Sequence, residues 1–97
     1  MVQVVRTITV LPGEKIIAIE RPHVLDRIFF SIKVIVNEGI WCKTKISFDD
    51  PTFFSCYLLD GVVKYFEAEG KDIFQGNIWI YNMTGATMFY VLTEILH

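Results

Sequence analysis

The chain has 97 residues, of which 53% are hydrophobic, and a formal net charge of −2 at pH 7. This length suits a single domain over residues 1–97 and leaves no room for a second. Lys and Arg occur singly along the chain, so the sequence offers no basic tract for a phosphate backbone and predicts no nucleic-acid partner. No apolar run approaches the ~18 residues that a membrane-spanning helix needs, so no membrane span is expected.

The apolar content is high for so small a chain. A domain of this size buries only about 60 to 65% of the surface of its unfolded chain, because small bodies have proportionally more surface. Some apolar side chains should therefore form a contiguous exposed patch, and such patches usually mark an interface. The sequence predicts a homo-oligomer, or a complex with other structural proteins.

The predicted elements are strands. The first covers residues 2–11 and ends at Leu11-Pro12-Gly13, where Pro presets φ and Gly accepts a positive φ, as in a type II turn. A short strand follows in residues 14–21 and stops at Pro22, which has no backbone N–H to donate. Residues 27–37 then alternate with period two, and one face carries Ile28, Phe30, Ile32, Val34 and Val36.

Three hairpins are predicted in the rest of the chain. The strongest signal is Asp60-Gly61 between residues 52–59 and 62–68, because both central positions of a type I′ turn need a positive φ. The other two hairpins join residues 27–37 to 40–48 through Asn37-Glu38-Gly39, and residues 73–81 to 86–96 through Asn82-Met83-Thr84-Gly85.

About eight strands at regular spacing, with no convincing amphipathic helix, predict an all-β chain. The expected fold is a single antiparallel β-sandwich of about eight strands. A jelly roll is the first choice of topology, and a barrel is the alternative.

The last strand is apolar on both of its faces. One face holds Thr87, Phe89, Val91, Thr93 and Ile95, and the other holds Met88, Tyr90, Leu92, Glu94 and Leu96. Such a strand is central in a sheet covered on both sides, or it presents its outer face to another subunit. The candidate interface residues are Met88, Tyr90, Leu92 and Leu96.

Aromatic residues are the candidates for ligand contact. Rings exposed on a sandwich can stack on sugars, although aromatic residues also fill cores and interfaces. Trp41 alternates with Lys43 and Lys45, which predicts that it faces solvent. The candidate ligand-binding residues, with carbohydrate as the ligand, are Trp41, Trp79 and Tyr81.

No catalytic residue, metal site or cofactor is expected. His23 and Asp26 could act as an acid–base pair, but no nucleophile context such as Gly-x-Ser-x-Gly accompanies them. Cys42 and Cys56 fit no zinc or redox spacing and read as buried thiols, with a disulfide open only if their strands are neighbours. Acidic residues near turns are more typical of solvated loops than of calcium or glycosidase sites, and they are Asp49, Asp50, Asp60, Glu67, Glu69 and Asp72.

Pro12-Gly13-Glu14, then FDDP, LDG and the closing GNIWIYNMTGATMFYVLTEI, resembles small β-sandwich modules of bacteriophage tail, fibre or head-accessory proteins. The resemblance implies a non-catalytic, oligomeric role and transfers no functional residue. We therefore expect a structural virion component rather than an enzyme, with a carbohydrate-binding module as the alternative. The first ten residues lack the features of a signal peptide, so synthesis in the cytoplasm is expected, with the virion as a destination.

Overall fold

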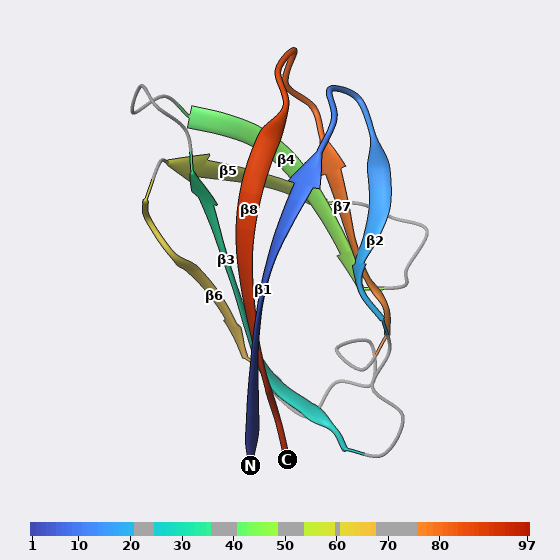
Figure 1. The fold of residues 1–97 in the computed structure, drawn as a ribbon, viewed down its shortest axis with the longest axis vertical. Coiled ribbons are helices and arrows are strands. Elements are labelled where there is room, and N and C mark those ends of the chain that lie inside the picture. The colour runs from blue at the N-terminus through green and yellow to red at the C-terminus, as the bar shows by residue number, and fades with distance from the viewer. Residues whose placement is uncertain (21–24, 36–40, 49–53, 60, 68–75) are drawn as a thin grey trace.

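The computed structural model describes residues 1–20, 25–35, 41–48, 54–59, 61–67 and 76–97. Each predicted strand segment corresponds to one strand, although β7 extends one residue past its predicted end, and the described residues include no helix (Figure 1). The strands are β1 (Val2–Val10), β2 (Lys15–Ile19), β3 (Arg27–Ile35), β4 (Trp41–Phe48), β5 (Phe54–Leu59), β6 (Lys64–Glu67), β7 (Ile78–Asn82) and β8 (Met88–Leu96).

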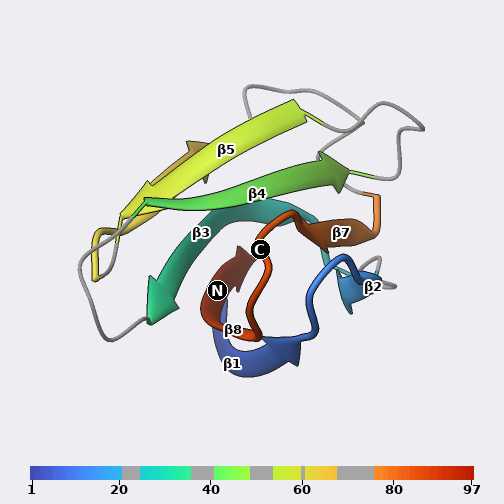
Figure 2. The same cartoon turned by 90° about the horizontal axis from the view of Figure 1, so that it is seen from above.

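The strands form two four-stranded antiparallel sheets. Sheet A has the order β1-β8-β3-β6, and sheet B has the order β2-β7-β4-β5. Seen from above, β4 and β5 lie on one side of the molecule, and β1 and β8 lie on the other (Figure 2). Successive strands alternate between the sheets except at β4 and β5, which is the strand order of a jelly roll. The predicted all-β sandwich of about eight strands is confirmed.

The three predicted hairpins are wrong, although their strands are present. In each case one strand lies in sheet A and the other in sheet B, so β3 does not pair with β4, β5 with β6, or β7 with β8. Gly61 has the expected positive φ of 73°, but its N–H donates to the carbonyl oxygen of Val34 at 3.1 Å. Each of these connections therefore joins strands of different sheets.

The first predicted turn is confirmed. Gly13 has a φ of 72°, and the N–H of Glu14 donates to the carbonyl oxygen of Leu11 at 3.0 Å, which closes the turn. The N–H of Gly13 also donates to the carbonyl oxygen of Asn82 at 2.9 Å. This bond joins the β1–β2 turn to the end of β7, and both lie at the end of the sandwich opposite the termini (Figure 1).

The space between the sheets is filled by apolar side chains from both of them. Phe30 and Phe66 of sheet A meet Phe48 of sheet B, with ring centroids between 5.6 and 6.0 Å apart. Aromatic pairs at this separation add about 0.5–1.5 kcal/mol beyond the area they bury. The buried core consists of Val10, Ala18, Ile19, Phe30, Ile32, Val34, Cys42, Ile46, Phe48, Leu58, Ile78, Ile80, Met88, Tyr90 and Leu92.

β3 departs from strict alternation at its start. The register against β8 shifts between Arg27 and Phe29, and Arg27 rather than Ile28 is buried. A bulge adds one residue to one strand and thereby re-aims the side chains beside it. Ile28 is therefore exposed although it shares a predicted face with the buried Phe30, and a charged residue is buried beside it.

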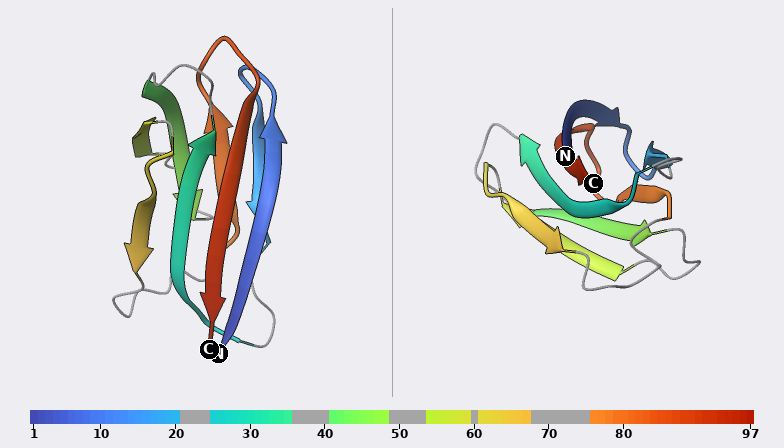
Figure 3. Two further views of the ribbon diagram at one scale, coloured as in Figure 1. Left: turned by 60° about the vertical axis from the view of Figure 1, so that its left-hand side comes forward. Right: turned by 90° about the horizontal axis from the view of Figure 1, so that it is seen from below.

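The two termini lie side by side. β1 and β8 pair over nine positions, from Val2 opposite Leu96 to Val10 opposite Met88 (Figures 1 and 3). Beyond β8, the backbone of His97 exchanges two hydrogen bonds with that of Asp26. Both ends of the chain are thus held in sheet A.

Candidate interaction surfaces

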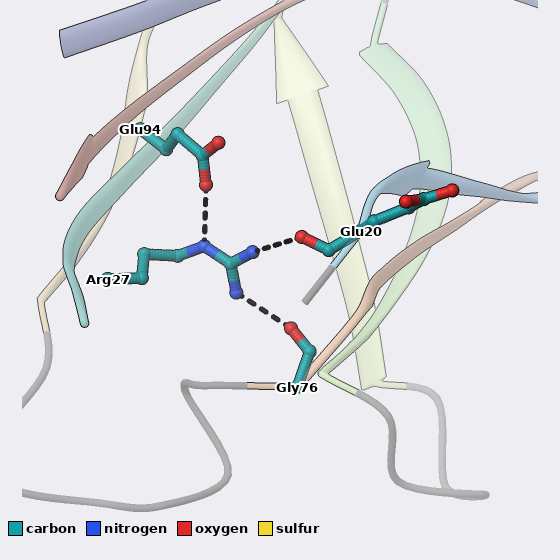
Figure 4. Close-up of polar contacts among 4 residues, drawn as sticks. All are labelled: Glu20, Arg27, Gly76 and Glu94. Carbon is teal, nitrogen blue, oxygen red and sulfur yellow. Dashed lines mark hydrogen bonds and ion pairs between the residues drawn. The ribbon is translucent and has the colours of Figure 1, made fainter. Parts of the chain in front are cut away.

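A buried guanidinium ties the two sheets together at the end where the termini lie. The Nε of Arg27 donates to Oε2 of Glu94 at 2.9 Å, and both side chains are buried. The Nη1 and Nη2 atoms donate to the carbonyl oxygens of Gly76, at 2.8 Å, and Glu20, at 3.2 Å (Figure 4). Arg27 and Glu94 belong to sheet A, whereas Glu20 follows β2 and Gly76 precedes β7 of sheet B. With its nitrogens engaged and water excluded, this group is a structural clamp.

A second polar group lies in the middle of the core. The Tyr90 hydroxyl of β8 lies 2.9 Å from Oγ1 of Thr44 on β4, and Sγ of Cys42 lies 3.4 Å from the same Oγ1. The contact between Tyr90 and Thr44 crosses between the sheets, in an interior where an unpaired hydroxyl would be costly. Cys42 is a free, buried thiol, so the disulfide with Cys56 that the sequence left open does not form.

The side-chain amide of Asn82 forms hydrogen bonds that hold the segment from residue 82 to residue 86. Nδ2 of Asn82 donates to the carbonyl oxygens of Val10 and Ala86, and Oδ1 accepts from the N–H and the hydroxyl of Thr84. Asn82 is fully buried. The side chain satisfies the turn and fastens it to the end of β1, which explains an Asn at this position without a binding role.

The structure describes only some of the residues considered for acid–base and metal chemistry. Asp26 is exposed, and its described contacts are the backbone bonds to His97; His23 lies outside the described residues. In the described part of the chain, no three His, Cys, Asp or Glu residues group closely enough to hold a metal ion. Glu67 belongs to β6. The remaining acidic residues weighed for calcium or glycosidase chemistry, Asp49, Asp50, Asp60, Glu69 and Asp72, lie outside the described residues.

The face of β8 that the sequence analysis assigned to an interface is the inner face. Met88, Tyr90 and Leu92 lie in the core, and Leu96 near the chain end is half-buried. The choice of face was wrong because period-two alternation defines two faces without saying which one meets the other sheet. Glu94 belongs to the same inner set, and its charge is paired with that of Arg27.

The outer face of sheet A carries large apolar side chains interspersed with polar ones, which are Gln3, Thr7, Thr9, Ser31, Lys33 and Thr93. Val5 and Tyr65 are 58% and 64% exposed, and Ile35 and Phe89 are 46% and 47% exposed. The register brings them onto one surface, because Val5 and Tyr65 occupy one cross-strand row while Phe89 and Ile35 pair in another. We call this surface the apolar face and define it by Val5, Phe29, Ile35, Tyr65, Phe89, Val91 and Ile95.

The outer face of sheet B is aromatic and basic. Trp79 and Tyr81, two of the predicted ligand-binding residues, are half-buried on β7, and Nζ of Lys15 lies 5.3 Å from the Tyr81 ring centroid. Trp41 begins β4, but its side chain lies outside the described residues. We call this surface the basic–aromatic face and define it by Lys15, Ile17, Lys43, Lys45, Tyr57, Trp79 and Tyr81.

The lysines of this face were overlooked as a group, because they are far apart in the sequence. The alternation of Lys43 and Lys45 on β4 was visible, but Lys15 joins them only through the pairing of β2 with β7 and of β7 with β4.

Comparison with known proteins gives no assignment. No protein-family model matches the chain, and a search of curated proteins returned no match. Among the described residues no helix is long and apolar enough to cross a membrane.

Proposed function

We propose that this chain is a non-catalytic structural module that self-associates, with the apolar faces of two copies in contact. The observation that carries the proposal is the group of large apolar side chains on the outer face of sheet A. Four of them, Val5, Ile35, Tyr65 and Phe89, are about half exposed or more. Scattered apolar residues are normal on a protein surface, but a contiguous group on one sheet is typical of an interface.

A second copy is the partner that fits this face best. The described side chains on the outer face of sheet A include a single charged group, Lys33. Two copies related by a twofold axis bring the same patch together, and a patch with many apolar side chains and few charges can be complementary to itself. The two larger dimensions of the molecule are 38 and 26 Å. A face of this size can supply the ~800 Å² per partner that a standard interface buries.

The biological setting we propose is a virion or a virion-like particle. Jelly-roll strand order is common in capsid domains, and it also occurs in lectins and cupins, so the fold supports this setting without deciding it. Capsid or tail genes beside the gene for this chain are the expected finding, and a metabolic gene cluster would contradict it.

Sedimentation equilibrium tests the self-association. We expect a mass near twice 11.2 kDa at micromolar concentration, falling toward the monomer on dilution. Phe89→Lys should weaken the dimer by about 2 kcal/mol, or roughly 30-fold, because it places a charge at a buried aromatic contact. Val5→Lys, on a different strand of the same face, should act in the same direction.

Tyr57→Lys is the matched control, because Tyr57 is also exposed but lies on the outer face of sheet B. It should leave the dimer unchanged. A wild-type chain that is monomeric throughout the concentration range, or a Tyr57→Lys variant that dissociates as readily as Phe89→Lys, would overturn the proposal.

A further inference from the structure

Charge is distributed unevenly between the strands of sheet B and the connections of this acidic chain. The strands β2, β4, β5 and β7 contain three lysines, Lys15, Lys43 and Lys45, and no Asp or Glu. The chain as a whole carries a net charge of −2. The acidic residues therefore belong to the other strands and the connections, and sheet B presents a cationic surface.

Aromatic rings lie in successive rows of the same surface. Trp79 and Tyr81 are two residues apart on β7, which places them roughly 7 Å apart along the strand. Tyr81 is directly opposite Lys45, and Lys43, in the next row, is directly opposite Tyr57. Trp79, Tyr81 and Tyr57 thus mark three consecutive rows.

The lysines are placed between these rings. Tyr81 has Lys15 opposite it on one neighbouring strand and Lys45 on the other, so the two lysines flank the ring at about 5 Å per strand. The ammonium group of Lys15 lies over the ring, a cation–π arrangement that holds the charge above the sheet. Tyr57 is 55% exposed and presents its ring to solvent at the far side.

We infer that the basic–aromatic face binds an acidic oligosaccharide, a chain of sugar rings that carry carboxylates. The apolar faces of sugar rings would stack on Tyr57 and Trp79, while the carboxylates would pair with Lys15, Lys43 and Lys45. Such a ligand would contact both the aromatic rings and the lysines of this face. The inference stands apart from self-association, because it concerns the opposite sheet.

Other occupants fit the surface less well. A neutral sugar would leave three lysines without a role, and an acidic peptide would leave the rings without one. Single-stranded nucleic acid offers rings and phosphates, but proteins that bind it by its backbone present a strongly basic groove, whereas this chain is acidic overall. A second copy would bring lysine against lysine across a twofold axis.

Four probes separate the requirement for rings from the requirement for charge. Calorimetry or Trp fluorescence would be used to titrate the full chain with a galacturonate oligomer, a neutral glucose oligomer, polyglutamate and an oligothymidylate. We expect the galacturonate oligomer to bind most tightly, with affinity that falls as salt rises. Equal binding of the neutral oligomer or of polyglutamate, tighter binding of the oligothymidylate, or no binding of any probe would overturn the inference.

Variants locate the site. Lys45→Gln and Lys43→Gln should each weaken galacturonate binding about twofold to fivefold, as expected for solvent-accessible charge pairs, and Tyr57→Ser should weaken it through loss of stacking. Lys64→Gln on β6 of sheet A removes the same charge from an exposed position and is the control. If Lys64→Gln weakens binding as much as Lys45→Gln, net charge rather than this surface is responsible and the inference fails.

Discussion

The Nε atom of Arg27 donates a hydrogen bond to Oε2 of Glu94 at 2.9 Å, across two neighbouring strands and out of contact with water. Burying two charges has a large desolvation cost, which is offset only if the geometry is good and the remaining donors are also bonded. Here the remaining nitrogens reach the carbonyl oxygens of Gly76 and Glu20. The two side chains therefore act as a unit that joins sheet A to sheet B.

Replacing only one of these two side chains should be strongly destabilising. We expect Glu94→Leu to lower the free energy of unfolding by about 3–5 kcal/mol, because it leaves the guanidinium of Arg27 buried without its counter-ion. The double variant Arg27→Met with Glu94→Leu should lose less than the sum of the two single variants. Urea denaturation measures each value. Lys33→Met, at a half-buried position on the outer face, serves as the control. If the double variant lost the sum of the two single losses in unfolding free energy, Arg27 and Glu94 would act independently.

The hydroxyl groups of Thr44 and Tyr90 in the core should also depend on each other, with a smaller loss of unfolding free energy when one is removed. Thr44→Val keeps the shape of the side chain but removes a partner of the Tyr90 hydroxyl, which should cost about 1–2 kcal/mol. The double variant Tyr90→Phe with Thr44→Val should be more stable than additivity predicts. Thr7→Val, exposed on β1, should change the unfolding free energy little, and an equal loss from Thr7→Val would refute the role of the buried pair.

Asn82 should control the order of the turn between β7 and β8. Asn82→Ala removes the donors to Val10 and Ala86 and the acceptor for Thr84, so we expect a loss of about 2–3 kcal/mol. Hydrogen exchange is the sharper measurement, because the backbone amide of Thr84 should lose protection before the core strands do. Unchanged protection at Thr84 would mean that the backbone holds the turn without the side chain.

Two glycines offer a matched test of backbone conformation. Neither Gly13 nor Gly85 has another heavy atom within 4 Å of the position that a Cβ would occupy, but only Gly13 of these two has a positive φ, at 72°. Gly13→Ala should therefore cost about 1 kcal/mol, and Gly85→Ala should stay within about 0.5 kcal/mol of the wild type. In a domain of this size the first change lowers Tm by roughly 4–8 °C. Equal Tm values for the two variants would contradict the assignment.

Local patterns in the amino-acid sequence were enough to place the strands and the first turn. Alternation of apolar residues marked β3 and β4, and Pro12-Gly13 marked a turn whose φ the structure confirms. These features depend on residues that are close in the chain, since strand periodicity and turn preference are local properties. The all-β class followed from them.

The partners of the strands and the inward faces depended on contacts between distant residues. Asp60-Gly61 predicted a reversal of the chain, but in a sandwich the reversed strand can join the same sheet or cross to the other, and here it crosses. β8 has two apolar faces, and only the packing of sheet A against sheet B decides that Tyr90 is buried and Phe89 exposed. The grouping of Lys15 with Lys45 around Tyr81 likewise exists only once three strands have paired, because each strand alone carries just one of the three residues in that row.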